Sequence, residues 1–397
     1  MATEYEAAVD LLIIGSGPTG VSALRSYRDR GGSGRALMIS DDPDLAYERP
    51  PLSKDYLRGT TGEDDIRLLE PGELDKLSAE TSTSPVVALD PGRHLVRDLA
   101  GSSWSYRWCV LATGSQPQLL PVPGGDDPRI LRLRTLEDAR SLRAAATSGA
   151  RTAAVIGSGF IGCEAAASLA RLGLNVTLIS DETAPQQRRL GAAAAGRIAG
   201  WLREDRVQLI TDATITRLDV GSDAVTIALE NGPSVQADIV LTAVGARPRS
   251  DLAAAAGLAM KEGRILTDAR MRTVLDGVLA AGDVAMAFNA AAGRPLAVEH
   301  WGEALRMGEI AGATAAGAED EWQNAPGFWS QVGDHQLKYA AWGDGFEQAQ
   351  LREHAGGAFT IWYTDRTGAT VGVLTHERDD DYEQGTELVE TAAKPPL

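Results

Sequence analysis

The sequence predicts an α/β fold that contains two copies of a nucleotide-binding βαβ unit and ends in a small α+β region. A short apolar run leads into a glycine-rich turn at residues 15–20, and the same order of features recurs at residues 157–162. Aromatic residues crowd into residues 328–363, and side chains alternate there as they do in antiparallel strands. The duplicated unit and the sheet that follows it indicate an architecture of several domains.

The first unit combines a strand at residues 9–14, a helix at 21–30 and a second strand at 36–40. Glycine suits the intervening turn because the turn is tight, a pyrophosphate approaches the backbone, and the helix packs close to the strand. The phosphate then lies at the helix N-terminus, where amide groups and the helix dipole favour negative charge. Acidic residues after the second strand accept hydrogen bonds from an adenosine ribose. The residues of this expected site are Gly15, Gly17, Gly20 and either or both of Asp41 and Asp42.

The second unit repeats this order with a strand at residues 153–156, an alanine-rich helix that ends near residue 171, and a strand at 174–179. Its glycines are Gly157, Gly159 and Gly162. A single glycine motif is a weak signal, so the strand and helix that flank each copy are what make the prediction specific.

The second unit leaves the choice of coenzyme open. Its last strand is followed by Ser180 and Asp181. If Asp181 reaches the ribose the site prefers NADH; if Ser180 takes that position, a 2′-phosphate is accepted and pairs with Arg188 and Arg189. These arginines are equally well interpreted as solvated surface residues, so the expected coenzyme is NAD(P)H.

Composition narrows the function class. The chain has 397 residues and a formal net charge of −17, which argues against nucleic acid and anionic membranes as partners. Its two cysteines, Cys109 and Cys163, form no Cys-x-x-Cys pair, so neither a disulfide framework nor a cysteine metal site is expected. No segment resembles a signal peptide or reaches the about 20 apolar residues of a membrane helix. We therefore expect a cytoplasmic protein.

Further strands that run into turns are expected at residues 108–112, 239–244 and 278–281. The predicted domains are residues 1–117 with 246–322, residues 118–245, and residues 323–397. The last of these is expected to contain a small antiparallel sheet, and the acidic tail beyond Glu377 is expected to pack loosely.

Six further segments carry a resemblance to a known family. They are residues 47–54 (YERPPLSK), 112–114 (ATG), 157–164 (GSGFIGCE), 281–283 (AGD), 299–301 (EHW) and 328–330 (FWS). With them the chain resembles, over nearly its whole length, the FAD-dependent pyridine nucleotide oxidoreductases of the ferredoxin reductase and apoptosis-inducing-factor type. The resemblance implies two Rossmann-like domains of the glutathione-reductase kind, the discontinuous one for FAD and the inserted one for NAD(P)H.

The resemblance also implies roles for single residues. Phe160 is expected against the nicotinamide, Glu299 near its amide, and Trp329 near the flavin ring. His300 is open between a cofactor contact and a satisfied interior histidine. The other cofactor contacts that the resemblance implies are Arg49, Pro50, Lys54, Val86, Ala112, Thr113, Gly114, Ile161, Gly245, Gly282, Asp283 and Trp301.

The resemblance pairs Lys54 with Glu164 beside flavin N5 and makes them the catalytic residues. A carboxylate partner keeps a buried lysine charged, and a positive charge there favours the reduced, anionic flavin. Taken singly, Lys54 is most simply a surface lysine and Glu164 a glutamate on a helix face. Within these two motifs the ion pair is the better interpretation.

The implied reaction is hydride transfer from NAD(P)H to flavin N5, followed by electron transfer to a ferredoxin-like iron–sulfur protein. Two alternatives stay open: an NAD(P)H oxidase or small-acceptor reductase without redox cysteines, and an NADH-sensing flavoprotein that dimerises. A dithiol relay is not expected, because no cysteine lies in residues 47–54, where disulfide-reducing relatives have one. Two departures from the family, Ser180 and the sequence Gln331-Val332 after Ser330, leave the coenzyme and the acceptor open. A homodimer is also left open.

Overall fold

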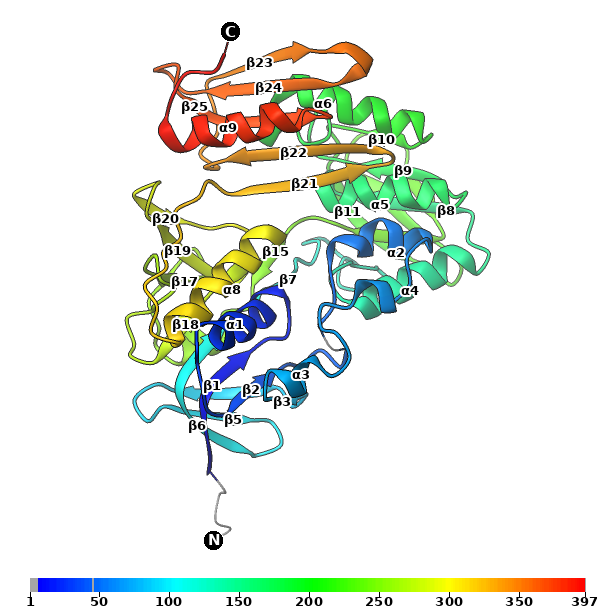
Figure 1. The fold of residues 1–397 in the computed structure, drawn as a ribbon. Helices are drawn as coiled ribbons and strands as arrows, with labels where there is room; N and C mark the ends of the chain where they lie inside the picture. Colours follow the sequence, from blue (N-terminus) through cyan, green and yellow to red (C-terminus); the bar gives the residue numbers. More distant parts are fainter. Residues whose placement is uncertain (1–5, 45, 397) are drawn as a thin grey trace. The chain divides into compact units, whose positions relative to one another are not determined.

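The computed structural model describes residues 6–44 and 46–396, which form two compact units (Figure 1). Unit 1 comprises Met1–Glu48, Arg67–Gln116 and Arg247–Gly327, and unit 2 comprises Arg49–Ile66, Pro117–Ala246 and Phe328–Leu397. Each unit is therefore assembled from separate stretches of chain. The division into three domains stays a prediction.

Unit 1 is built on a mostly parallel sheet with strand order β3-β2-β1-β6-β5-β4, in which β18 also pairs with β6. Its strands are β1 (Glu6–Ile14), β2 (Ala36–Ile39), β3 (Ala79–Ser82), β4 (Val86–Asp90), β5 (Leu95–Asp98), β6 (Ser103–Leu111) and β18 (Val278–Ala280). The pairs β1–β2, β1–β6, β2–β3 and β6–β18 are parallel, whereas β4–β5 and β5–β6 are antiparallel. The central strands are buried, which explains the continuous apolar run of β1.

Two of the helices of unit 1 pack closely against each other. The helices of this unit are α1 (Pro18–Asp29), α3 (Glu73–Lys76), α7 (Asp251–Ala255), α8 (Trp301–Ala315) and the short η3 (Gly282–Val284). Helices α1 and α8 lie side by side (Figure 1). A Cβ atom on Gly308 would lie 2.3 Å from the carbonyl oxygen of Thr19, and one on Gly312 would lie 2.1 Å from that of Ala23. Backbone therefore meets backbone along this interface, and no side chain fits there.

A smaller sheet completes unit 1, with strand order β16-β17-β19-β20. Its strands are β16 (Met260–Lys261), β17 (Arg264–Thr267), β19 (Ala285–Asn289) and β20 (Arg294–Leu296). Two short strands, β7 (Ser115–Pro117) and β15 (Ala246–Pro248), contain positions where the chain passes from one unit to the other.

Unit 2 contains the second parallel sheet, with strand order β10-β9-β8-β14. Its strands are β8 (Thr152–Ile156), β9 (Asn175–Ile179), β10 (Gln208–Ile210) and β14 (Ile239–Thr242). The helices of this part are α2 (Asp55–Arg58), α4 (Leu136–Thr147), α5 (Phe160–Arg171) and α6 (Gln187–Glu204), with η1 (Pro50–Ser53) and η2 (Asp64–Ile66). An antiparallel sheet adds β11 (Ile215–Val220), β12 (Val225–Leu229) and β13 (Val235–Ala237).

Both predicted βαβ units are confirmed, as β1-α1-β2 and β8-α5-β9. Helix α1 begins at Pro18, three residues before its predicted start at residue 21. Proline suits the first helical position because it lacks the N–H that would have no partner there. The last glycine of the motif, Gly20, is therefore a helical residue rather than part of the turn.

The C-terminal part of unit 2 contains the predicted antiparallel sheet, which has five strands in the order β21-β22-β25-β24-β23. Its strands are β21 (Gly327–Val332), β22 (His335–Ala341), β23 (Gln348–Glu353), β24 (Phe359–Thr364) and β25 (Thr370–His376), with η4 (Ala355–Gly357) between β23 and β24. The pairs β22–β25, β25–β24 and β24–β23 are antiparallel.

The prediction of a loosely packed acidic tail is wrong, because the tail forms α9 (Asp379–Thr391), which packs on this sheet (Figure 1). Its three leading aspartates lie in the first turn, where the helix dipole favours negative charge. Gly385 lies against Val373 of β25, and the indole nitrogen of Trp342 donates to the carbonyl oxygen of Val389 at 3.1 Å. The acidic composition thus reflects one solvated face of a packed helix.

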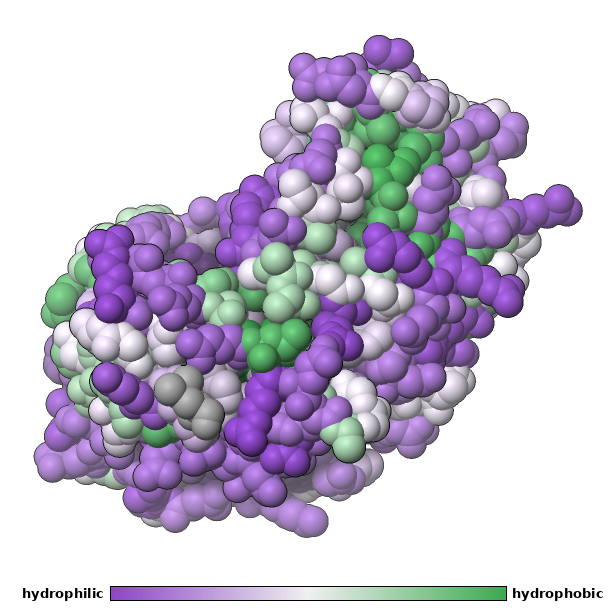
Figure 2. All heavy atoms as spheres, turned by 90° about the horizontal axis from the view of Figure 1, so that it is seen from above, coloured by the Kyte–Doolittle hydropathy of each residue, from purple (hydrophilic) through white to green (hydrophobic). Residues whose placement is uncertain are grey.

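Hydrophilic residues cover most of the face drawn in Figure 2, and apolar residues gather in a few patches. Among the described residues, no helix is both long and apolar enough to cross a membrane. In the same part of the chain, no group of three or more His, Cys, Asp or Glu side chains is arranged to hold a metal ion.

Glu303 is a buried carboxyl group in the first turn of α8. It accepts a hydrogen bond from the indole nitrogen of Trp322 at 2.7 Å. Burial raises its pKa, although Arg306 and the hydrogen bonds from Trp322 and Gly327 partly oppose this. A carboxyl group with a raised pKa binds more protons in the folded than in the unfolded protein. Its contribution to stability therefore falls as the pH rises from the unfolded pKa, about 4.3, through the folded value.

We expect Glu303→Gln to raise the thermal unfolding midpoint at pH 8, because glutamine still accepts from Trp322 but carries no charge. At pH 4 the wild type is itself largely protonated, so the two midpoints should converge. Circular dichroism melting curves at both pH values measure this. Glu319→Gln, at a side chain that is 80% exposed, is the control. A difference between wild type and Glu303→Gln that is equal at both pH values would contradict the assignment.

Candidate functional site

The glycine-rich loop of unit 1 fits a dinucleotide pyrophosphate. Gly15 has φ +117°, and a Cβ atom there would lie 2.2 Å from the carbonyl oxygen of Ala112. A Cβ on Gly20 would lie 2.1 Å from the carbonyl oxygen of Gly15. Gly17 is the N-cap of α1 and brings no capping side chain. The amide groups of the first turn therefore remain available to a phosphate.

The loop of unit 2 repeats this geometry. Gly157 has φ +103°, and a Cβ atom there would lie 2.3 Å from the carbonyl oxygen of Ala243. A Cβ on Gly162 would lie 2.0 Å from the carbonyl oxygen of Gly157, and Gly159 is the N-cap of α5. The chain thus holds two sites that fit the same kind of ligand group.

The acidic residues after β2 are held by partners that the sequence did not reveal. Asp41 forms an ion pair with Arg249. Asp42 accepts from the hydroxyl of Tyr47 at 2.6 Å, and its amide donates to the hydroxyl of Ser40 at 3.1 Å. Tyr47 belongs to the motif 47–54, but its bond to Asp42 depends on the fold. Arg249 lies in no motif that the sequence singled out.

The residues that follow β9 in unit 2 also have partners within the fold. Ser180 is only 2% exposed and shares a hydrogen bond with Ser158, with 2.6 Å between the hydroxyl oxygens. Asp181 and Arg188 form an exposed ion pair, in which one guanidinium nitrogen lies 2.8 Å from each carboxylate oxygen. Glu182 accepts from the backbone amide of Arg188 at 2.8 Å. The arginine is therefore paired with acidic residues of its own unit.

Asp283 lies close to the first loop, as a ligand of the same cofactor would. Its carboxylate accepts from the hydroxyl of Ser115 at 2.8 Å and is buried. The preceding Gly282 has φ +75°, and a Cβ atom there would lie 2.4 Å from the hydroxyl oxygen of Thr19 in α1. Next to Ala112, the Thr113 hydroxyl donates to the carbonyl oxygen of Arg249 at 2.7 Å.

The predicted ion pair between Lys54 and Glu164 is confirmed. The ammonium nitrogen lies 2.7 Å from the carboxylate, and both side chains are 5% exposed. Lys54 also donates to the carbonyl oxygen of Pro50 at 2.9 Å, and its ammonium lies 5.1 Å from the ring centroid of Trp329. Such a cation over an indole face is attracted to it. The structure therefore keeps a positive charge in place beside an aromatic ring.

Glu164 is satisfied by more donors than lysine alone. The hydroxyl of Ser53 donates to it at 2.6 Å and that of Ser330 at 2.7 Å, and the amide of Gln331 lies 3.3 Å away. Ser53 and Ser330 were missed as site residues, although both lie inside motifs that the resemblance uses. The sequence did contain a clue, because each of the two motifs includes a serine. Only the fold shows that both reach the same carboxylate.

Aromatic side chains surround the start of α5. Phe160 packs edge-on against Phe328 with ring centroids 4.7 Å apart, and the guanidinium of Arg189 lies 5.9 Å from the Phe160 ring. The neighbouring Ile161 is 45% exposed and Trp329 is 43% exposed. Exposed apolar residues at this position are suited to contact a ligand.

The other expected cofactor residues are placed in one unit or the other, and their roles stay predictions. Val86, Gly114, Glu299, His300 and Trp301 lie in unit 1, and Arg49 and Gly245 lie in unit 2. Glu299 pairs with Arg264, and His300 is the N-cap of α8. A guanidinium nitrogen of Arg49 donates to the carbonyl oxygen of Arg134 at 2.7 Å.

Both thiols are unsuited to redox chemistry. Cys109 in β6 and Cys163 in α5 are unpaired and 0% exposed. Burial raises the pKa of each thiol far above its usual value, and Glu164 adds to this at Cys163. A thiol is nucleophilic only as the thiolate, so these residues are apolar core side chains.

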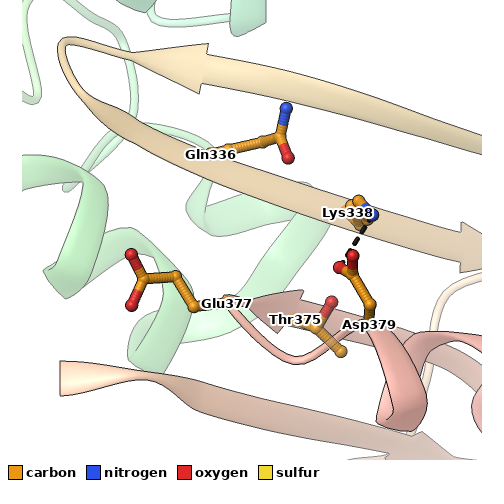
Figure 3. A pocket seen from close by; sticks show the side chains of 5 residues that line it. All are labelled: Gln336, Lys338, Thr375, Glu377 and Asp379. Carbon is orange, nitrogen blue, oxygen red and sulfur yellow. Dashed lines mark hydrogen bonds and ion pairs between the residues drawn. The ribbon is translucent and has the colours of Figure 1, made fainter. Parts of the chain in front are cut away.

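A separate pocket of about 380 Å³ lies on the C-terminal sheet of unit 2 (Figure 3). It is lined by Gln336, Lys338, Thr375, Glu377 and Asp379. Lys338 and Asp379 neutralise each other at 2.7 Å. The pocket contains neither a glycine-rich turn nor a helix-capping glycine, so it does not fit a dinucleotide.

Two dinucleotide loops on parallel sheets define the class of protein, a dinucleotide-dependent oxidoreductase. The chain belongs to the pyridine nucleotide-disulphide oxidoreductase family, whose model matches residues 9–316. FAD and NAD(P)H are the cofactors of this protein, in keeping with its family and relatives. Despite the family's name, the two cysteines here are buried and separate.

The curated relatives and solved structures agree with this assignment. Rhodocoxin reductase of Rhodococcus erythropolis is 30% identical, over 89% of this chain and 83% of that one. The ferredoxin–NAD(+) reductase component of the anthranilate 1,2-dioxygenase system of Burkholderia cepacia is 32% identical, over 98% and 96%. The ferredoxin reductase of the CYP199A2 system from Rhodopseudomonas palustris superimposes with a TM-score of 0.91 at 27% identity, over 97% and 96%.

The buried ion pair makes a testable contribution to stability. Lys54→Met leaves Glu164 charged and buried without its cation, which costs about 3–5 kcal/mol when a buried pair is broken. Lys54→Met/Glu164→Gln removes both charges, and the amide can still bond both serines, because its oxygen accepts from one hydroxyl and its nitrogen donates to the other. Most of the loss should therefore be recovered. Urea unfolding followed by circular dichroism measures both.

The exposed pair Arg140–Glu63 in the same unit is the matched control, with side chains 34% and 46% exposed. Breaking it should cost at most about 1 kcal/mol. If Lys54→Met/Glu164→Gln is no more stable than Lys54→Met, the loss does not come from an unpaired buried charge at Glu164.

Proposed function

We propose that this protein is an FAD-dependent NAD(P)H reductase that delivers electrons to a ferredoxin-like iron–sulfur protein. The observation that carries the proposal is the buried Lys54–Glu164 pair, because it places a fixed positive charge in the segment where disulfide-reducing relatives have a cysteine. A charge there can stabilise a reduced flavin, but it cannot exchange with a disulfide. The reaction therefore passes electrons through the flavin alone.

We assign FAD to the loop at residues 15–20 and NAD(P)H to the loop at residues 157–162. When bound, the flavin accepts a hydride from the nicotinamide and releases electrons to a one-electron acceptor. The residues of the chain bind, orient and tune it. Gly15 and Gly157 bring backbone amides to the pyrophosphates, and Asp283 is assigned to the ribityl and phosphate region.

Lys54 is assigned to the flavin, where its ammonium opposes the negative charge that reduction creates. Glu164 is a positioning residue: it holds the lysine in place and offsets the cost of burying it. Hydrogen bonds from Ser53 and Ser330 hold the Glu164 carboxylate in one orientation, and this in turn orients the Lys54 ammonium. Trp329 covers the lysine on one side and is assigned to the flavin ring.

Relatives support the acceptor. They include reductases named for ferredoxins, and one solved structure is a covalent putidaredoxin reductase–putidaredoxin complex, with a TM-score of 0.91 at 26% identity. Ferredoxins are usually acidic and this chain has a net charge of −17, so docking requires a local face of arginine and lysine residues. We further propose a cytoplasmic location, which suits its unpaired cysteines.

The acceptor is tested by steady-state turnover with each coenzyme against a ferredoxin, oxygen and ferricyanide. We expect ferredoxin to raise the rate well above that with oxygen, and the gain to fall with rising salt because docking is electrostatic. Rapid flavin reoxidation by oxygen with no gain from ferredoxin would instead favour an oxidase. Slow turnover with a change in oligomer mass on NADH addition would favour a sensor.

Lys54→Met should lower the flavin reduction potential by tens of millivolts, because it removes a positive charge that favours the reduced form. For a two-electron couple, about 30 mV corresponds to about 1.4 kcal/mol. Spectroelectrochemical titration of the purified flavoprotein measures this. Lys338→Met removes a lysine from the distant surface pair with Asp379 and should leave the potential unchanged. An unchanged potential and rate in Lys54→Met would remove this residue from the mechanism.

A further inference from the structure

Helix α6 is interrupted near its start by a glycine. Gly191 has φ +78° and ψ 172°, which is not helical, so residues 187–190 form a turn that is separate from the rest of the helix. A Cβ atom at this position would also lie 3.0 Å from a ring carbon of Phe346, closer than ordinary van der Waals contact. A single helical turn is not stable through its own hydrogen bonds. The turn 187–190 therefore depends on contacts with other parts of unit 2.

A buried tyrosine of the C-terminal sheet provides one such contact. Tyr363 in β24 is 1% exposed, and its hydroxyl donates to the carbonyl oxygen of Leu190 at 2.8 Å. Leu190 ends the turn and is 0% exposed, so this carbonyl oxygen is shielded from water. Burial raises the pKa of Tyr363 well above its usual value, so the hydroxyl keeps its proton at neutral pH. The hydrogen bond thus ties the turn to the sheet.

The turn carries an arginine that lies beside the second glycine-rich loop. The guanidinium of Arg189 is 5.9 Å from the ring centroid of Phe160, the first residue of α5. Burial raises the pKa of Tyr339 in β22 to about 12, and the positive charge of Arg189 opposes this rise. Arg189 is therefore close enough to act on both the loop and the C-terminal sheet.

Aromatic rings connect the loop to the same sheet by a second route. The ring of Phe160 packs against Phe328 with centroids 4.7 Å apart, and Phe328 packs against Tyr339 at 5.6 Å. Tyr339 in turn packs against Tyr363 at 5.9 Å. Together with the contacts of the turn 187–190, these contacts form a closed ring that begins and ends at Phe160. A closed ring of packed side chains restricts the orientation of each member.

We infer that Tyr363 is a positioning residue for the coenzyme at the second glycine-rich loop. Its hydroxyl holds the turn 187–190, and this turn keeps Arg189 against Phe160, the residue expected against the nicotinamide. The inference rests on the proposed function, which assigns NAD(P)H to this loop. Hydride transfer depends steeply on the geometry of the two reacting groups, so the orientation of the Phe160 ring affects the rate. Because Tyr363 is buried, it acts through these residues and does not touch the coenzyme.

Calorimetric binding to the FAD-loaded protein tests this role without turnover. The ligands are NAD⁺ and 5′-AMP, or NADP⁺ and 2′,5′-ADP if the wild type prefers NADPH. Only the complete coenzyme carries a nicotinamide. In Tyr363→Phe we expect its affinity to fall about 3- to 10-fold, the range that the loss of one hydrogen bond supports. The affinity for the adenosine fragment should not change, whereas a general loosening of unit 2 would weaken both ligands alike.

Stopped-flow reduction of the flavin by the coenzyme, without an electron acceptor, is the second measurement. At saturating coenzyme the rate no longer depends on affinity, so it reports how well the nicotinamide is placed. We expect the limiting rate constant in Tyr363→Phe to fall by a similar factor. The FAD content and the circular dichroism spectrum of the variant report whether it has folded.

A second substitution tests whether Tyr363 acts through the arginine. Arg189→Gln removes the cation beside Phe160. In that background Tyr363→Phe should have no further effect on either measurement, because the contact through which it acts is already lost. Trp342→Phe is the matched control, since Trp342 follows β22 and also donates to a helix carbonyl oxygen, that of Val389 in α9 at 3.1 Å. It should leave both measurements unchanged.

Equal losses of affinity for the coenzyme and its adenosine fragment in Tyr363→Phe, or no loss of either, would overturn the inference. So would a limiting rate that the substitution leaves unchanged, or effects of the two substitutions that simply add. If neither coenzyme reduces the flavin of the wild type, the proposed function fails. A selective loss of coenzyme affinity in Tyr363→Phe would then still support the positioning role.

Discussion

Backbone must approach backbone where each nucleotide-binding strand turns into its helix. A methyl group on Gly15 or Gly157 would lie 2.2 or 2.3 Å from a carbonyl oxygen of the neighbouring strand segment, so only glycine is possible at both positions. The first turns of α1 and α5 follow directly on these close approaches. Because glycine N-caps leave the amides of these turns without a side-chain partner, the same constraint that shapes the fold prepares two anion-binding sites.

The Lys54–Glu164 pair shows a different kind of constraint. Removing two charges from water costs free energy. The attraction between them offsets this cost only when other groups form hydrogen bonds with their remaining lone pairs and protons. Here two hydroxyls, one amide and one carbonyl oxygen do so. The donors come from η1 and β21, and the carboxylate comes from α5. Three separate segments of unit 2 therefore hold the ion pair. The Lys54 ammonium has a fixed position, unlike that of a lysine on the surface.

The sequence predicted the βαβ units and the glycine loops because their signals are local: apolar strands, a turn that needs glycine, and a helix. Lys54 and Glu164 were paired through resemblance, and the geometry agrees. Arg249, Ser53 and Ser330 were not identified, because their partners are brought to them only by folding. Helix α9 was misjudged because its acidic first turn dominates the composition, while its few apolar positions, such as Val389, are spread at helical spacing.

Unit 1 is made of three stretches of chain, and its last stretch runs to Gly327. During synthesis on the ribosome, α1 and the central strands emerge early, but β18 and α8 follow only after most of unit 2. Until α8 has been made, the surface of α1 that Gly308 and Gly312 of α8 contact stays exposed to water. The FAD-assigned site is therefore completed late in translation, and the nascent chain must keep an unfinished apolar surface from aggregating while the second unit is still being made.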